Sequence, residues 1–249
     1  MSETMKYIII NSYDRPNQNE SDTNFNLSIT GGTNYASLSK IAVCRFVCTN
    51  SVYNVDTTNN ILNFEEDSGG PVTANIPVGN YNLSQIITAL QIAMDAVSPN
   101  LRTYTITSSV ITNKLTITGS AGTFQILLDS GLGLNLMLGF SRNSNSLSGL
   151  AVTAPRIYNL NRYSSFILKS NLTRGDTYNT VQGNRQAILD TIPISQSFNG
   201  DIFTYEPQTL LWRDLSYSSI EQIQLRLTDE KDQIINLNGG FMTVYLVVK

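Results

Sequence analysis

The chain contains no histidine. Histidine is the usual general base of Ser/His and Cys/His nucleophile systems and a common zinc ligand, so its absence argues against these sites. Two cysteines, Cys44 and Cys48, cannot complete a four-ligand zinc site within one chain. The phosphate-binding pattern G-x-x-x-x-G-K-[ST] does not occur either. We therefore expect a protein that is not an enzyme, with no catalytic residue, no metal and no cofactor.

Charged residues are also scarce, at 14% of 249 residues, with a net charge of −3. In ordinary domains roughly a quarter of the residues are charged. Each buried charge needs a partner, so a chain with few charges can hide much of its surface against other subunits. The net negative charge argues against a protein whose main role is to bind nucleic acid.

Long apolar runs are missing as well. A membrane-spanning helix needs about 18 or more consecutive apolar residues, and no run in this chain approaches that length. The first residues, MSETMKYIII, lack the basic start and long apolar stretch of a secretion signal. We expect no membrane span and a protein that is not secreted.

Two short acidic clusters, at 65–67 and 229–232, are the remaining candidates for chemistry. A glycosidase needs only two carboxylates, but both clusters lie at predicted turns, where acidic side chains are simply solvated. Neither cluster has the ligand spacing of a calcium loop. A weak calcium site at either cluster stays open as an alternative.

Most of the chain reads as short β-strands bounded by Asn, Gly, Asp and Pro. The predicted strands are 5–10, 24–29 and 40–48, and then 164–172, 187–194, 202–207, 209–215, 220–229 and 240–248. Their number is eight or nine, which is typical of antiparallel sandwiches, barrels and jelly rolls. We expect the last two strands to be antiparallel neighbours, because a short turn-rich segment joins them.

One segment between the two strand groups has the pattern of a helix. Apolar residues from Leu83 to Val97 recur at helical spacing, so that they share one face. Asn82 and Gln85 have the spacing of a capping box, and Pro99 ends the helix. With the strands around it, this helix predicts a small inserted α+β module, in which the helix covers the module's own sheet.

Charge is unevenly distributed along the chain. Acidic residues predominate between 56 and 130, and basic residues between 142 and 185. One interpretation is a scattered, solvated set. The other is a basic surface that meets an acidic surface on another subunit, or packaged DNA. The candidate subunit-interface residues are Arg142, Arg156, Arg162, Lys169, Arg174 and Arg185 on the basic side, and Glu65, Glu66, Asp67, Asp201 and Glu206 on the acidic side.

Four segments together resemble a known family. These are IPVGNYNLSQIITALQIAM, YTITSSVITNKLTIT, FQILLDSGLGLNLMLGF and the closing IEQIQLRLTDEKDQIINLNGGFMTVYLVV. They resemble the penton (minor capsid) proteins of virophages and polinton-like viruses, a single jelly-roll family. The segment 142–185 has no counterpart in this pattern, and Gln233 stands where a glycine is common in the final turn.

The resemblance implies a mainly β fold: an antiparallel eight-stranded single jelly roll formed by 1–59 and 142–249, with 60–141 as the inserted α+β domain. It also implies a homopentamer at the fivefold vertices of an icosahedral capsid, in contact with the major capsid protein. The protein would then be located in the virion, after assembly in the host cell. A non-catalytic recognition module, such as a carbohydrate-binding β-sandwich or a viral fibre or receptor-binding head, is the alternative.

Overall fold

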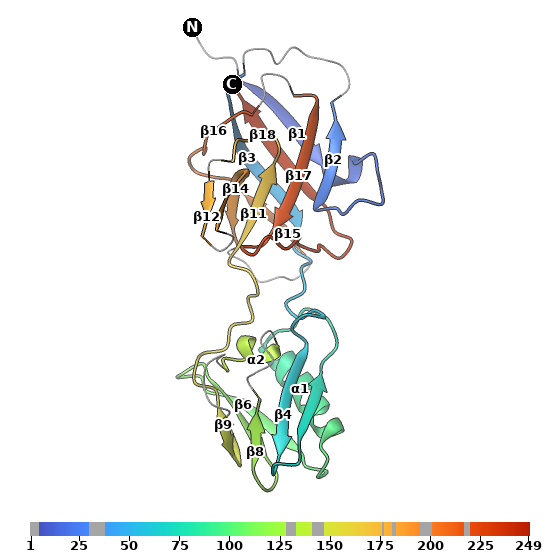
Figure 1. Cartoon of the computed structure of the whole chain (residues 1–249), viewed down its shortest axis with the longest axis vertical. Helices are drawn as coiled ribbons and strands as arrows, with labels where there is room; N and C mark the ends of the chain where they lie inside the picture. Colours follow the sequence, from blue (N-terminus) through green and yellow to red (C-terminus); the bar gives the residue numbers. More distant parts are fainter. Residues whose placement is uncertain are drawn as a thin grey trace. The chain divides into compact units, whose positions relative to one another are not determined.

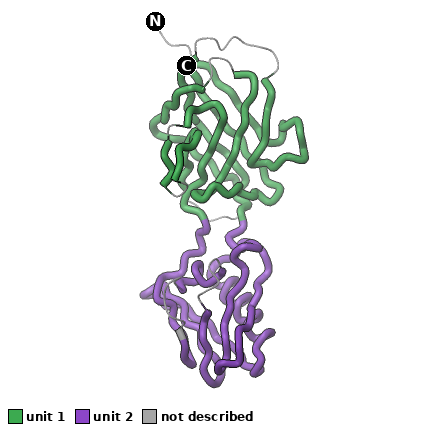
Figure 2. Tube along the Cα trace, in the orientation of Figure 1, with its two compact units in different colours: residues 1–52, 163–249 green, residues 53–162 purple. Residues whose placement is uncertain are grey.

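The structure, a computed structural model, describes residues 5–29, 38–127, 133–140, 147–175, 177–180, 183–194, 201–216 and 220–249. These residues are mainly β, and they form several antiparallel sheets. The chain divides into two compact units (Figures 1 and 2). Unit 1 comprises Met1–Val52 and Tyr163–Lys249, and unit 2 comprises Tyr53–Arg162.

The described residues of unit 1 form two larger sheets and one small hairpin. The first sheet has the order β1 (Lys6–Asn11), β18 (Met242–Val248), β3 (Lys40–Thr49) and β15 (Ile202–Tyr205), with the short β16 (Arg213–Asp214) also paired to β3. The second has the order β14 (Ile188–Pro193), β11 (Ser165–Ser170), β17 (Gln222–Thr228) and β2 (Asn24–Ser28). The hairpin is formed by β12 (Thr177–Asn179) and β13 (Asn184–Gln186). The chain passes back and forth between the two larger sheets, which is jelly-roll-like.

The two larger sheets of unit 1 enclose one apolar core. Phe46 from the first sheet and Phe166 from the second are both buried in it. The alternation predicted for β17 is confirmed, because Ile223, Leu225 and Leu227 are buried while the residues between them are half-buried. Successive side chains of a strand point to opposite faces, so one face of β17 belongs to the core and the other faces outward.

The prediction that 220–229 and 240–248 are neighbours is wrong. β17 pairs with β11 and β2, whereas β18 pairs with β1 and β3 in the other sheet. β17 alternates between buried and more accessible residues over most of its length, whereas β18 is buried at every residue except Tyr245, and neither pattern specifies which strand lies beside it. The segment after β17 first folds back on that strand, since Thr228 bridges Ile234 and the Ile235 amide donates to the Leu227 carbonyl at 3.0 Å, and it then crosses to the other sheet before β18 begins. The strand predicted at 209–215 shortens to β16.

The described residues of unit 2 form two sheets and two helices. One sheet has the order β5 (Pro71–Asn75), β4 (Ile61–Glu66), β8 (Phe124–Ile126) and β9 (Leu147–Gly149). The other has the order β10 (Ala151–Thr153), β7 (Leu115–Gly119) and β6 (Tyr104–Ser108). The helices are α1 (Leu83–Val97) and the short α2 (Leu134–Met137). A second apolar core, separate from that of unit 1, holds these elements together.

The helix α1 has the bounds and the capping box that the sequence predicts. The Asn82 side chain accepts from the Gln85 amide, and the Gln85 side chain accepts from the Asn82 amide. Ile86, Leu90 and Met94 are buried against β5 and β6. Its polar face is narrower than the sequence indicates, because Gln91 is half-buried and its Nε2 donates to the carbonyl of Tyr104 at 3.2 Å.

Unit 2 is longer at both ends than the predicted insertion at 60–141. β9 pairs with β8 and β10 pairs with β7, so residues assigned by sequence to the jelly-roll domain belong to the inserted unit. Val152 and Ala154 are buried in its core. These strands have three residues each, which is too short for a recognisable alternation of apolar and polar side chains.

Candidate subunit interface

Arg162, one of the predicted interface residues, is engaged inside unit 2. Its Nη1 pairs with the Asp56 carboxylate, and its Nη2 donates to Oγ1 of Thr58 at 3.2 Å. Partial burial would raise the pKa of Asp56, but hydrogen bonds from Thr58 and the charge of Arg162 lower it below its ordinary value. This ion pair joins the first and last segments of unit 2, so it serves the fold of one chain.

Glu66 is also engaged internally, because its carboxylate is fully buried. Ser98 Oγ and Tyr104 Oη donate to its Oε1 at 2.6 and 2.7 Å. The Asn100 amide donates to Oε2 at 3.2 Å, and Arg102 Nε lies 3.7 Å from the same oxygen. Burial alone would raise the pKa of Glu66, but these donors and the Arg102 charge outweigh burial, so its pKa is lowered.

The other two members of the acidic cluster differ in their exposure. Asp67 is exposed and pairs with the guanidinium of Arg102. The amide of Thr123, donating at 3.0 Å, and then the Arg102 guanidinium lower the pKa of Asp67. Glu65 is half-buried on β4, opposite Gln125 of β8. The cluster 65–67 therefore joins strands and loops within unit 2, and Asp67 and Glu65 are its accessible members.

The basic candidates are divided between the two units. Arg156 belongs to unit 2, whereas Lys169, Arg174 and Arg185 belong to unit 1. Lys169 is buried on β11, but the two arginines of unit 1 and Arg156 are exposed. Arg142 lies outside the described residues. Only the exposed members have the access that a contact with another subunit requires.

The acidic candidates of unit 1 flank β15, with Asp201 just before the strand and Glu206 just after it. Both are exposed. Oε1 of Glu206 lies 3.1 Å from Nε of Arg45, and the Arg45 guanidinium lies 5.5 Å from the ring centre of Tyr245. Exposed ion pairs of this kind contribute at most about 1 kcal/mol.

An exposed apolar patch, which the sequence analysis did not identify, lies on the edge strand β1. It consists of Met5, Tyr7 and Ile9, which are 50%, 67% and 64% exposed and share the outer face of the sheet. Ile9 lies opposite Tyr245 of β18, which extends the patch towards Arg45. The signal in the sequence was MKYIII, in which both faces of a predicted strand are apolar. We call these three residues the β1 patch.

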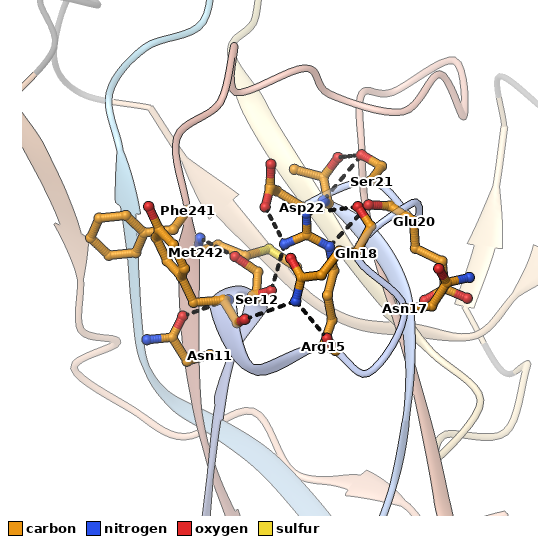
Figure 3. A network of polar contacts seen from close by, with 12 residues as sticks. Asn11, Ser12, Arg15, Asn17, Gln18, Glu20, Ser21, Asp22, Phe241 and Met242 are labelled. Atoms are coloured by element: carbon orange, nitrogen blue, oxygen red, sulfur yellow. Dashed lines mark hydrogen bonds and ion pairs between the residues drawn. The ribbon is translucent and has the colours of Figure 1, made fainter.

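The loop that follows β1 is held by a polar network around Arg15 (Figure 3). Arg15 Nη1 donates to the Ser12 carbonyl at 2.8 Å and contacts the Asp22 carboxylate at 2.5 Å. Its Nε donates to the Glu20 carbonyl at 3.0 Å. The Ser12 hydroxyl also accepts from the Met242 amide at 3.0 Å, which ties the loop to the start of β18. The C-terminal end of β1 is therefore held by contacts within the chain.

Unit 2 also exposes apolar side chains, at the turn between β6 and β7. Val110 and Ile111 are adjacent and are 91% and 90% exposed. The turn itself is well ordered by local bonds: the Asn113 amide donates to the Ser109 carbonyl at 2.8 Å. Two neighbouring apolar side chains therefore project from a turn of defined shape.

The described residues offer little for a metal site. No three of their Asp, Glu or Cys side chains lie close enough together to hold a metal ion. No helix in the described part of the chain is long and apolar enough to cross a membrane.

Comparison with known proteins identifies the fold. No protein-family model and no curated protein sequence matches the chain. Among solved structures, the crystal structure of the mavirus penton protein matches 98% of this chain and 99% of that chain, with a TM-score of 0.56 and 10% sequence identity. The chain therefore has a penton-like fold, and the family resemblance of its sequence is confirmed at the level of the fold.

Proposed function

We propose that this protein is a capsid structural protein, a penton subunit that forms homopentamers at icosahedral fivefold vertices. The observation that carries this proposal is the likeness in fold to the mavirus penton protein along 98% of the chain. In this proposal unit 1 is an eight-stranded single jelly roll that builds the ring. Unit 2 is the α+β domain inserted between β3 and β11 of that jelly roll.

A ring of identical subunits needs two different surfaces on each subunit, because one surface contacts a different surface of the next copy. The first sheet of unit 1 offers two such surfaces at its opposite edges. The β1 patch marks one edge, and β15 with the exposed Ile202 marks the other. We propose that the β1 patch of one subunit packs against the β15 edge of the next, with Asp201 and Glu206 as the polar rim.

The remaining partners follow from the same assembly. We propose contact with the major capsid protein of the same virion, after assembly in the host cell and without secretion. The exposed Arg174 and Arg185 are the residues that we propose for the basic side of a subunit contact or for a weak contact with packaged DNA. The proposed role is structural and requires no catalytic group or cofactor.

Native mass spectrometry of the purified protein tests the ring. We expect a pentamer that weakens modestly in high salt, because its main contacts are apolar. Ile9→Asp places a charge in the β1 patch and should leave monomers, whereas Ile111→Asp makes the same change at an exposed site of unit 2 and should leave the ring intact. Circular dichroism checks that both variants are folded.

A wild-type protein that stays monomeric in low and high salt, with and without the major capsid protein, would contradict this proposal. That outcome would instead favour the non-catalytic recognition module. A ring that survives Ile9→Asp would contradict the assignment of the β1 patch while leaving the pentamer in place.

A further inference from the structure

The turn between β6 and β7 carries two apolar side chains that are almost fully exposed. Val110 and Ile111 are adjacent in the sequence and are 91% and 90% exposed. Every residue from 109 to 113 is exposed, so the turn projects from the surface of unit 2. Apolar groups in water lack the favourable free energy that burial in an apolar environment provides. The pair is therefore suited to an apolar environment that lies outside the chain.

Local hydrogen bonds fix the shape of this turn. The Asn113 amide donates to the Ser109 carbonyl at 2.8 Å, and the Thr112 amide donates to Ser109 Oγ at 3.1 Å. The Ser109 amide donates to the Lys114 carbonyl at 3.0 Å, which closes the turn. These three amides already have acceptors within the turn, which lowers the cost of moving them from water into a less polar phase.

A third apolar side chain and a cation lie beside the turn. The Tyr158 amide donates to the Asn113 carbonyl at 3.1 Å, so the segment that contains Arg156 and Ile157 runs next to it. Ile157 is 60% exposed, and Arg156 is exposed as well. We call the three apolar residues the β6–β7 patch, which consists of Val110, Ile111 and Ile157.

The charges beside the patch are of one sign. Neither Lys114 nor Arg156 forms an ion pair with a described residue, whereas Arg102 and Arg162 are paired within unit 2. The hairpin with its turn, from 104 to 119, and the segment 154–158 contain no acidic residue. The patch therefore presents apolar side chains next to a local excess of positive charge.

An anionic lipid bilayer matches both features of the patch. Its acyl chains accept apolar side chains, and its negative surface attracts Lys and Arg side chains that lie just outside them. A projecting turn can enter this deformable phase without a partner of matching shape, whereas a protein partner would need a pocket that fits both apolar side chains. Apolar insertion together with basic residues also provides the two signals that stable attachment to a membrane requires.

We propose that the β6–β7 patch attaches unit 2 to an anionic lipid surface. Val110 and Ile111 enter the boundary between the head groups and the acyl chains, with Ile157 beside them. The Lys114 ammonium and the Arg156 guanidinium contact the anionic head groups. This inference goes beyond the proposed capsid role and does not depend on the pentamer, because the proposed ring contacts belong to unit 1.

Flotation of the full-length protein with lipid vesicles tests the proposal. We expect binding to mixed phosphatidylcholine–phosphatidylserine vesicles, and binding that is at least about fivefold weaker to pure phosphatidylcholine. Ile111→Asp should lower the affinity for the mixed vesicles by about tenfold or more, because a charge replaces an apolar side chain that lipid would bury. Ile92→Asp makes the same change at a 64% exposed site on α1 and should change the affinity by less than about twofold.

Native mass spectrometry checks that both aspartate variants keep the oligomeric state of the wild type. The number of patches on each particle is then equal, so a difference in affinity cannot come from multivalency.

The positive charge is tested separately by Lys114→Gln and Arg156→Gln. Each variant should lower the affinity for the mixed vesicles by about fivefold and leave binding to pure phosphatidylcholine unchanged. Lys231→Gln removes the same charge from an exposed site of unit 1 and should change the affinity by less than about twofold.

Insertion of the turn is measured with Ile111→Trp. Trp side chains favour the interface of a bilayer, so this variant should bind at least as tightly as the wild type. Brominated lipids should quench its fluorescence more than that of the wild type, whose single tryptophan, Trp212, belongs to unit 1. Ile92→Trp is the control and should show no more quenching than the wild type.

Four results would overturn the proposal. If the wild type does not bind to the mixed vesicles at millimolar lipid, the apolar pair would need a protein partner instead. An equal loss for Ile92→Asp and Ile111→Asp would mean a general effect of added negative charge. Equal binding to both kinds of vesicle would contradict the role of Lys114 and Arg156. The absence of extra quenching in Ile111→Trp would show that the turn stays in water.

Discussion

Arg162, the last residue of unit 2, forms an ion pair with Asp56 near the start of the same unit. A second contact lies beside it, in which Asn54 Nδ2 donates to the Leu160 carbonyl at 3.3 Å. The chain therefore enters and leaves unit 2 at one place. An insertion with adjacent ends can be removed without stretching the host domain, because the two cut ends need only a short linker.

Replacing 53–162 with a short Gly/Ser linker should leave a folded unit 1. We expect a β-type circular dichroism spectrum and a cooperative unfolding transition, since no core residue of unit 1 lies in the deleted range. Deletion of 60–141 is the matched comparison. It should give a poorly soluble protein, because Val152 and Ala154 remain in the chain while most of the apolar core that buries them is removed. Loss of all structure after the longer deletion would show that the units fold as one.

Substitutions on α1 should separate its buried face from its exposed face. Leu90→Ala should destabilise unit 2 by about 2–5 kcal/mol, because the side chain is fully buried and leaves a cavity. Thr88→Ala, on the exposed face, should change stability by no more than about 0.5 kcal/mol. Gln91→Ala should lie between them, at about 1 kcal/mol, because it loses the bond to Tyr104.

The measurement is urea unfolding followed by two probes. Helical circular dichroism reports mainly α1, whereas the fluorescence of Trp212, the single tryptophan, reports unit 1. The α1 variants should shift the transition seen by circular dichroism and leave the transition seen by Trp212 fluorescence in place. A shift of the fluorescence transition by Leu90→Ala would mean that the stability of unit 1 depends on unit 2.

Unit 2 should lose stability in acid through Glu66. Its pKa in the folded chain lies below the ordinary value of 4.5, so its contribution is complete above that pH and is lost as the pH falls through the folded pKa. Asp56 and Asp67 act in the same direction, since their pKa values are also lowered. We expect the midpoint of unfolding of unit 2 to fall as the pH drops below 4.5.

Glu66→Gln isolates the contribution of this carboxylate. At neutral pH the variant should be less stable by about 3 kcal/mol, because the buried Arg102 loses one of its two anionic partners. The difference from the wild type should shrink as the pH falls, since the wild-type carboxyl becomes protonated. A difference that stays constant with pH would assign the loss to packing and not to charge.

The two cysteines should differ from ordinary thiols in their reactivity. Burial raises the pKa of the Cys48 thiol to about 12, and the side chain is inaccessible on β3. The half-buried Cys44 also has a raised pKa through burial. Iodoacetamide at neutral pH should therefore leave Cys48 unmodified in the folded protein and label it in urea, as followed by mass spectrometry. Labelling of Cys48 without denaturant would show that β3 opens locally.

The sequence predicts the elements of this fold better than their partners. The helix at 83–97 was predictable to the residue, because its apolar stripe, its capping box and Pro99 are all local signals. Most strands of the two larger sheets of unit 1 were predictable for the same reason, but the hairpin β12–β13 was not predicted and the strand expected at 209–215 shortens to β16. Their pairing was not predictable, since neither the alternation of β17 nor the nearly continuous apolar run of β18 specifies a neighbour, and only the packing of the two sheets assigns one.

For the candidate interface as well, the sequence identifies charged residues but not the partners that they contact. Arg162, Glu66 and Lys169 were expected at a surface, but each finds a partner within the chain that lies far away in the sequence. Charge counted along the sequence cannot reveal such pairs. The β1 patch was missed for the opposite reason, because an apolar residue in a predicted strand is normally assigned to a core, and whether the strand lies at an edge depends on the whole sheet.

The position of β18 has a consequence for protein synthesis. β18 follows all other described strands in the sequence, yet it lies between β1 and β3 and is the only described strand that pairs with β1. Unit 2 is complete once Arg162 has left the ribosome, so it can fold while translation continues. Unit 1 must wait for β18, and until then β1 lacks the only described strand that pairs with it and β3 lacks one of its neighbours. In a nascent chain that stalls before Met242, unit 2 can therefore be folded while unit 1 is not. The apolar strand β1 is then exposed and can aggregate.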